Sequence, residues 1–266
     1  MTTPIATSDA VSPIVPPKFG LLSVAGEITD APRWEIAGVS FTPTPRPSGT
    51  LIAAECTPGP TDPPLEFRDG RPSADSAPPF VVYAGFTCKL PGLTIDEVND
   101  EAQRTLQASV VPELEAKAWE LFAADVVEPF GTDAVSPAVG VGLLEQWLEQ
   151  EYAGAGAIHA PRRLGAVLGA NRVVFRDGDV QRTQLDTPVA FGNYPETGAA
   201  GAAAGAGNVW LIATGRVLTA SSQVRVRSAE ALFDRTTNIV TGVASQAWAL
   251  TFDDVAAAIK ITVEGS

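Results

Sequence analysis

A single histidine and two cysteines limit the side-chain chemistry open to this chain of 266 residues. Catalysis of the Ser-His-Asp or Cys-His type would have to use His159 as its base, because the sequence holds no other imidazole. His159 stands in Gly-Ala-Ile-His-Ala-Pro (156–161), and no Gly-x-Ser-x-Gly nucleophile elbow occurs. We therefore interpret His159 as a loop histidine and predict that the protein is not an enzyme.

The sequence offers equally few candidate ligands for a metal ion or a cofactor. Cys56 and Cys88 are far apart and fit none of the usual zinc spacings, and no Asp-x-Asp-x-Asp-Gly loop is present for a hard cation. Two cysteines are too few for a disulfide scaffold, so free thiols in a reducing cytoplasm are the default, although a Cys56–Cys88 pair stays open. The sequence predicts no metal and no cofactor.

Two glycine-rich stretches lack the features of a phosphate site. Residues 140–145 (Gly-Val-Gly-Leu-Leu-Glu) have two glycines of a dinucleotide fingerprint, but a glutamate replaces the third and would repel a pyrophosphate. Residues 201–207 lack the Lys-Ser/Thr of a phosphate loop. The carboxylate clusters are explained by a turn or by the polar side of a helix: Asp253-Asp254, and Glu145, Glu149 and Glu151.

Composition narrows the function classes. The net charge is −13, and the densest basic stretch, from Arg162 to Arg182, is interrupted by two aspartates, so the sequence predicts no specific nucleic-acid binding. Charged residues make up 18% of the chain, below the roughly 25% of a typical soluble domain. Either much of the surface is buried against other subunits, or the chain is an ordinary apolar β-rich domain. We find neither a signal peptide nor an apolar run of the ~18 residues that a membrane span needs, so we expect synthesis in the cytoplasm and no membrane contact.

The elements that would have to position any site begin with two irregular regions. Residues 1–33 are rich in Pro, Thr, Ser and Ala, which is typical of an arm that becomes ordered only against a partner. Residues 34–41, 50–56 and 80–86 are strand-like, and the Pro- and Gly-rich stretch 57–79 between them predicts a long loop.

Helices follow, each with a recognisable start. Thr94 and Glu97 form a capping box, and apolar residues at helical spacing predict a helix over 95–125, which Pro112 should kink or split. Ser136-Pro137 begins a second helix, and Pro161 is expected to begin a short third one that ends near Gly169.

The last third of the chain is rich in strands. Asp-Gly at 177–178 predicts a hairpin between 172–175 and 180–185, and residues 198–207 predict a flexible loop. The remaining strands are expected at 188–191, 209–213, 216–220, 223–227, 238–243, 246–252 and 257–263.

This order of parts resembles the HK97-like fold of tailed-phage capsid proteins and of encapsulin shells. The local likeness is carried by Leu164-Gly165, the Leu-Asp-Thr-Pro-Val of 185–189, the Gly-rich loop 198–207 and the Val-Trp-Leu-Ile-Ala of 209–213. Residues 238–240 and 247–250 resemble the late strands of the family. The resemblance implies an α+β chain with these parts: N-arm 1–33, E-loop 34–92, P-domain with spine helix 93–132, A-domain 133–225 and returning P-domain strands 226–266.

The function implied is that of a major capsid protein. Copies would assemble as hexamers and pentamers into an icosahedral head that encloses double-stranded DNA without specific binding, in a virion built in the host bacterial cytoplasm. The region 34–86 has no lysine and Lys89 lies at the loop base, so we expect no lysine–asparagine crosslink between subunits. The chain leaves no room for a scaffolding segment before the arm, so any scaffolding or decoration protein would be separate.

The residues expected at assembly interfaces lie in the E-loop and in the loop 193–207, which the family places near the capsomer axis: Trp34, Phe41, Phe67, Arg68, Arg71, Asn193, Tyr194 and Glu196. Three alternatives remain open. They are an encapsulin-like shell with protein cargo, another virion protein such as a tail-tube, decoration or connector subunit, and an enzyme that uses carboxylates on an unfamiliar fold.

Overall fold

The computed structural model describes residues 14–28, 33–44, 75–89, 93–152, 154–195, 197–198, 201–227, 232–234 and 236–263. The chain divides into two compact units. The first comprises residues 1–17, 83–111 and 224–245, and the second comprises 18–82, 112–223 and 246–266. Three elements contribute residues to both units: helix α2 (Ile95–Asp125) and strands β4 (Phe80–Lys89) and β12 (Ile239–Phe252).

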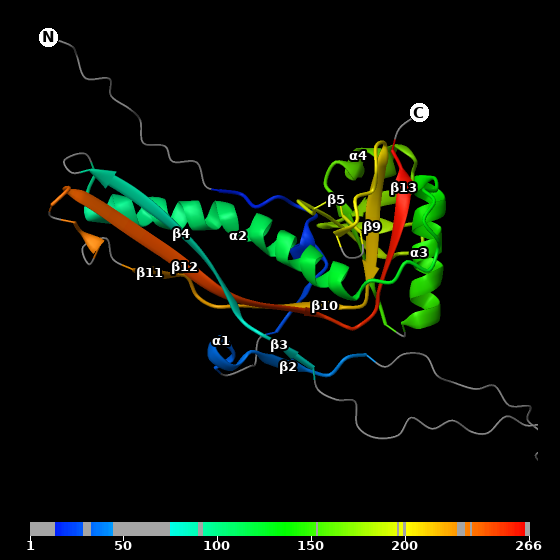
Figure 1. Cartoon of the computed structure of the whole chain (residues 1–266), viewed down its shortest axis with the longest axis horizontal. Helices are drawn as coiled ribbons and strands as arrows, with labels where there is room; N and C mark the ends of the chain where they lie inside the picture. The colour runs from blue at the N-terminus through cyan, green and yellow to red at the C-terminus, as the bar shows by residue number, and fades with distance from the viewer. Residues whose placement is uncertain are drawn as a thin grey trace, which may run out of the picture. The chain divides into compact units, whose positions relative to one another are not determined.

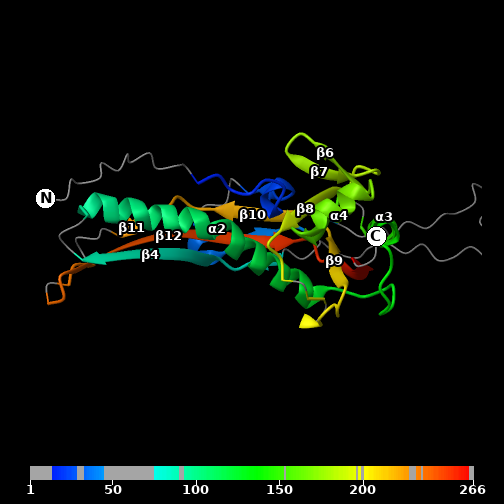
Figure 2. The same cartoon turned by 90° about the horizontal axis from the view of Figure 1, so that it is seen from above.

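A six-stranded sheet is the centre of the second unit. Its strands follow the order β13 (Ala256–Thr262), β9 (Asn208–Thr214), β5 (Ala157–Pro161), β8 (Pro188–Gly192), β7 (Val180–Thr183) and β6 (Val174–Asp177). Strands β5 and β8 run parallel, and the other neighbours are antiparallel. Strands β9 and β13 lie side by side next to helix α3 (Figure 1). The expected Asp-Gly hairpin is confirmed as β6–β7, and it projects from the sheet edge (Figure 2).

The core of the second unit lies on this sheet. All five residues of β5 are buried, and β9 is buried from Val209 to Thr214 without alternation, as expected for a strand covered on both faces. Helix α3 (Pro137–Glu151) contacts β13 and β9, and helix α4 (Leu164–Ala170) contacts β5 and β6. Fully burying one Leu or Ile side chain contributes about 1.5–3 kcal/mol, so this layer supplies much of the folding free energy.

Two boundaries predicted from the sequence are wrong. Pro161 ends strand β5, and helix α4 begins only at Leu164. The strands expected at 238–243 and 246–252 are one continuous strand, β12. The returning strands of 226–266 also separate, because β12 pairs with β10 (Val217–Ser221) whereas β13 joins β9 in the six-stranded sheet.

Part of the predicted arm docks on its own chain. Residues 21–23 form a 3-10 helix (Leu21–Ser23), Leu21 is completely buried, and β1 (Gly26–Glu27) pairs in parallel with β10. The Phe191 N–H donates to the carbonyl of Phe19 at 2.6 Å. The expectation that all of 1–33 needs a partner to become ordered is therefore wrong for this part, and residues 1–13 lie outside the described residues.

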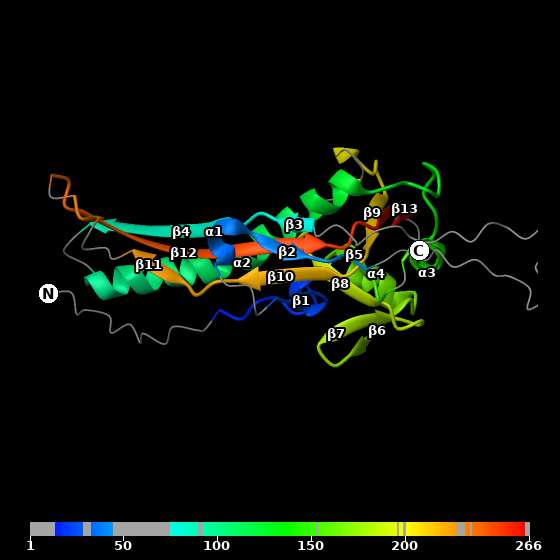
Figure 3. The same cartoon turned by 90° about the horizontal axis from the view of Figure 1, so that it is seen from below.

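The start of the predicted E-loop also differs from expectation. Residues 34–41 are not one strand, because a short helix α1 (Trp34–Ala37) precedes β2 (Val39–Phe41). Gly38, at φ +81°, supplies the backbone conformation that links them. Strand β2 lies beside β3 (Asp75–Ala77), with which it pairs (Figure 3). Val39 packs with Ala220 and Ala249. The predicted strand 50–56 and most of the loop 57–79 lie outside the described residues.

The first unit is a helix on a sheet. Strands β4, β12 and β11 (Arg225–Arg227) belong to a five-stranded sheet whose other strands are β10 and β1. The capping box is confirmed: the Thr94 N–H donates to Glu97 Oε2 at 2.6 Å, and the Glu97 N–H donates to Thr94 Oγ1 at 3.2 Å. The Thr94 N–H and the Thr94 hydroxyl, which donates to Glu97 Oε2 at 2.8 Å, lower the pKa of Glu97. The predicted helix 95–125 is confirmed as α2, and Pro112 does not split it.

Candidate functional site

A buried carboxylate joins helix α2 to two other segments of the second unit. Glu115 is only 3% exposed. Its Oε1 accepts the N–H of Leu21 at 3.3 Å, and its Oε2 accepts the N–H of Asn193 at 2.6 Å. We call these three groups the Glu115 clasp. One side chain thereby fixes the docked part of the arm and the start of the loop that follows β8.

Burial and the neighbouring polar groups shift the pKa of Glu115 in opposite directions. Burial raises the pKa of Glu115, whereas the N–H groups of Asn193 and Leu21 and the charge of Arg162 lower it, and the net shift is upward. The Arg162 side chain donates to the carbonyl of Phe191 at 3.3 Å. A carboxylate at this position can hold two backbone segments, but its raised pKa makes the contact dependent on pH.

Two glycines make room for the clasp. A Cβ on Gly20 would lie 2.2 Å from Glu115 Oε1, and a Cβ on Gly192 would lie 2.8 Å from Glu115 Cδ. Both distances are shorter than real carbon contacts. The Glu115 clasp therefore requires glycine at positions 20 and 192 as well as the carboxylate.

Aromatic residues hold the loop after β8. Trp119 stacks on Tyr194 with ring centroids 5.1 Å apart, and its Nε1 donates to the carbonyl of Thr197 at 2.8 Å. Trp210 Nε1 donates to the carbonyl of Ala202 at 3.0 Å. Each indole therefore provides apolar area and one directed hydrogen bond, so that helix α2 and strand β9 fix the described part of this loop.

His159 is a core residue, which corrects its interpretation as a loop histidine. It lies in β5 with no exposed surface, because Tyr194 Oη contacts Nδ1 at 3.2 Å, Thr214 Oγ1 contacts Nε2 at 3.0 Å and Phe122 packs on the ring. Burial lowers its pKa to about 3. A neutral, enclosed imidazole suits a structural role and is a poor general base.

A second buried polar group lies at the turn after β12. Asp253 is 1% exposed, and its Oδ2 accepts the hydroxyl of Tyr152 at 2.6 Å. Tyr152 Oη also accepts the N–H of Arg216 at 3.1 Å and lies 3.3 Å from Thr44 Oγ1, whose hydroxyl can donate to it. Asp253 therefore does more than occupy a turn, since it helps to anchor the base of the predicted E-loop at Thr44.

The predicted interface residues differ in how far they are exposed. Trp34 and Phe41 are half-buried in the second unit, Asn193 is exposed, and Tyr194 is 5% exposed with its ring inside the fold. Phe67, Arg68, Arg71 and Glu196 lie outside the described residues. Glu115 was missed, although it interrupts a helical row of apolar residues that includes Trp119 and Phe122.

Large apolar side chains are exposed on several elements. The most exposed are Ile36 at 86%, Tyr83 at 75%, Leu185 at 75% and Val15 at 73%. Single exposed apolar residues are common on protein surfaces, and these four lie in different segments of the chain.

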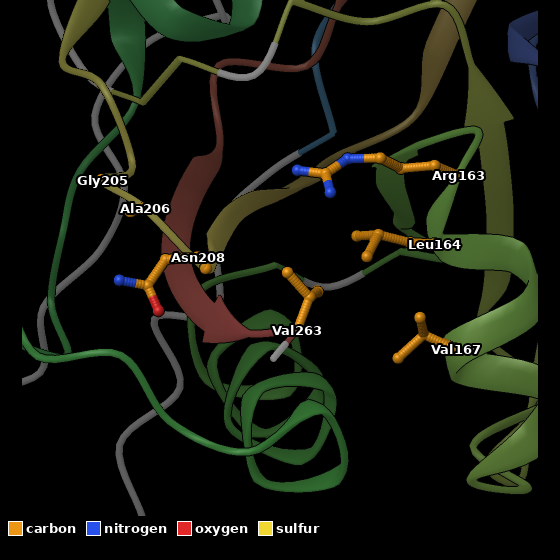
Figure 4. Close-up of a pocket in the computed structure, with 8 residues that line it drawn as sticks. Arg163, Leu164, Val167, Gly205, Ala206, Asn208 and Val263 are labelled. Atoms are coloured by element: carbon orange, nitrogen blue, oxygen red, sulfur yellow. The ribbon is translucent and has the colours of Figure 1, made fainter. Parts of the chain in front are cut away.

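The pockets offer no evident chemistry. One pocket of about 450 Å³ lies between α4 and the turn before β9, and its lining includes Arg163, Leu164, Asn208 and Val263 (Figure 4). No described residues form a group of three or more potential metal ligands. Within the described part of the chain, no helix is both long and apolar enough to span a membrane.

The chain is similar to solved structures but not to any known protein sequence family. No protein-family model and no curated protein matches the sequence. The capsid of an empty GTA particle is 13% identical, with a TM-score of 0.54 over 98% of this chain and 95% of that one. A structure from Mycobacterium phage Che8 is 10% identical, with a TM-score of 0.56 over 97% and 96%. The SrpI encapsulin from Synechococcus elongatus PCC 7942 is 12% identical, with a TM-score of 0.52 over 98% and 94%.

These likenesses extend over nearly the whole of each chain, so they concern the complete architecture and not one shared motif. At 10–13% identity they establish the fold alone. The chain has the HK97-like α+β fold that phage capsid and encapsulin shell subunits share.

Proposed function

We propose that this protein is the major capsid protein of a tailed phage, which self-assembles as hexamers and pentamers into the head shell around double-stranded DNA. The observation that carries the proposal is the likeness to shell subunits over at least 97% of this chain, with TM-scores of 0.52–0.56. Homo-oligomeric assembly, a location in the virion and the lack of enzymatic activity are parts of the same proposal.

The surface supports a subunit that is completed by its neighbours. Ile36 and Tyr83 expose large apolar side chains, and the low share of charged residues fits a chain whose surface is covered by other copies. We assign these contacts to the region 34–92 and to the loop 193–207. A net charge of −13 would limit adhesion to DNA phosphates, so a packaged genome could slide past the shell.

An encapsulin-like compartment is the second candidate. The likeness to the SrpI encapsulin, at a TM-score of 0.52, supports it about as well as the phage structures support a capsid. The two candidates differ in content, because a capsid encloses DNA and an encapsulin encloses protein cargo.

Expression of the chain, with deletions, tests the proposal. We expect the full chain to form closed particles by negative-stain microscopy, alone or with a separate scaffolding protein. Deleting residues 1–13 or 57–74 should prevent assembly but leave the circular dichroism of a folded subunit. Normal particles from both deletions would contradict the interface assignment. Particles from the native source that hold a defined protein cargo and no DNA would favour the compartment.

A further inference from the structure

The sheet of the first unit has one covered face and one open face. Val98, Ala102 and Leu106 of α2 are completely buried, and a Cβ on Gly242 of β12 would lie 2.8 Å from the Val98 carbonyl oxygen. Helix α2 therefore packs on the side of the sheet where Val240, Gly242 and Ala244 point. Successive strand residues alternate between faces, so the odd-numbered positions of β12 lie on the other side.

Contacts between strands identify which residues share this open face. Thr87 of β4 and Thr241 of β12 bring their hydroxyls within 3.2 Å. Arg225 pairs with Ser245 and Arg227 pairs with Val243, and directly opposed residues of antiparallel strands share a face. The open face therefore comprises Tyr83, Gly85, Thr87, Lys89, Ile239, Thr241, Val243, Ser245, Arg225 and Arg227, and Asp234, which is directly opposed to Ile239, lies at its end.

The open face is basic in an acidic protein. Lys89, Arg225 and Arg227 are exposed, whereas a carboxylate at this face, Asp234, accepts the Thr236 N–H and the Thr237 hydroxyl. Tyr83, on the same face, is 75% exposed. A face that carries basic residues and an exposed aromatic ring fits an acidic protein surface, because the ring supplies apolar area and the cations supply orientation.

The same unit carries an acidic surface on its helix. The exposed carboxylates of Asp96, Glu97 and Asp100 lie in the first turns of α2. Glu97 is explained by the capping box and Asp96 by the helix dipole. Asp100 has neither reason, and it lies four residues from Asp96, where like charges on a helix repel. A partner that brings positive charge would relieve this repulsion.

We propose that the open face docks on the first turns of α2 of a second copy of this chain. The two surfaces differ and are complementary, so the contact is heterologous and can repeat from subunit to subunit into a ring. The inference rests on the proposed function and names the surfaces through which neighbouring shell subunits recognise each other.

Charge reversal tests this pairing. Lys89→Glu with Arg227→Glu should lower the fraction of subunits in particles at least about tenfold, because like charges across an interface cost several kcal/mol. Asp96→Lys with Asp100→Lys should do the same. A chain with all four changes should recover assembly, because each contact again joins opposite charges. Sedimentation and negative-stain microscopy measure the particle fraction, and circular dichroism checks that each variant is folded.

The matched control is Lys18→Glu with Lys117→Glu, which has the same charge change. Each of these lysines makes an exposed ion pair in the second unit, at 3.3 Å to Asp179 and 2.9 Å to Glu120. The control should assemble as wild type. Normal assembly of the Lys89/Arg227 variant, shells that lose only nucleic acid, or failure of the four-change chain to recover would each overturn the inference. If the wild-type chain forms no particles in any setting, the proposed function fails first.

Discussion

The two larger sheets formed by the described residues differ in how completely their faces are buried. In the six-stranded sheet, every residue of β5 is buried, and β9 is buried from Val209 onward. Strand β4 alternates between buried and exposed residues, with Ala84 buried and Tyr83 open. The first pattern is that of a sheet covered on both faces, and the second is that of a sheet with one buried and one open face.

This difference separates folding from assembly. Residues of the six-stranded sheet should affect whether the subunit folds, whereas residues of the open face should affect whether subunits join. Substitutions in the two sheets can therefore be ordered by their expected cost to subunit stability. A different measured order would contradict this separation of folding from assembly.

Leu211→Ala should have the largest effect. Leu211 has no exposed surface in β9, so the substitution creates a cavity and should lower the free energy of unfolding by about 2–5 kcal/mol. Urea unfolding of the unassembled subunit measures this cost. A loss below 1 kcal/mol would mean that the sheet is not the folding core.

Gly192→Ala comes next. The new Cβ would meet Glu115 Cδ at 2.8 Å and the Tyr194 ring at 2.7 Å, and overpacking of this kind costs about 1–3 kcal/mol. Gly169→Ala is the matched control, since nothing lies within 4 Å of its Cβ position. Equal unfolding midpoints for the two variants would refute the close packing at the clasp.

Several of these elements could be predicted from the sequence because their signals are local. The capping box at Thr94, the apolar stripe of α2 and the hairpin signal at 177–178 each lie within a few residues, and each is found, although the hairpin turn is shifted by one residue to Gly178-Asp179. Helix α1 was missed because four residues are too short for a helical period to be visible. Strand β5 was missed because Pro161 suggested the start of a helix, whereas it ends a strand.

The Glu115 clasp could not be predicted, because its partners lie far along the chain. Leu21 and Asn193 are 94 and 78 positions from Glu115, and both contribute backbone N–H groups, which have no sequence signature. His159 was misplaced for a related reason, since its burial depends on Phe122, Tyr194 and Thr214 from other elements. Long-range packing decided both positions.

Glu115→Gln should have a moderate effect that depends on pH. The amide keeps one acceptor but places an NH₂ group opposite the other N–H, which should cost about 1–3 kcal/mol. The folded pKa of Glu115 lies above its unfolded value, so its contribution to stability is greatest at low pH and declines as pH rises through that interval.

The advantage of wild type over Glu115→Gln should therefore shrink between pH 4 and pH 7, as measured by urea unfolding of the two chains at matched salt. Glu113→Gln, an exposed neighbour on α2, is the control. An advantage that grows with pH would mean that the ionised carboxylate is favoured in the fold, contrary to its burial.

Tyr83→Ala should have the smallest effect on the subunit and a clear effect on assembly. Its side chain is 75% exposed, so the free energy of unfolding should change by no more than about 0.5 kcal/mol. Assembly should fall, because the ring is the largest apolar group of the open face. If particle yield stays at the wild-type level, this face is not an interface.

The central claim is that this chain is a shell subunit, and microscopy of the assembled protein tests it most directly. A reconstruction of particles formed by the wild-type chain should show a closed icosahedral shell in which neighbouring copies cover Tyr83 and Ile36. A stable monomer at high protein concentration, with or without a scaffolding protein, or an open tube, would contradict the claim.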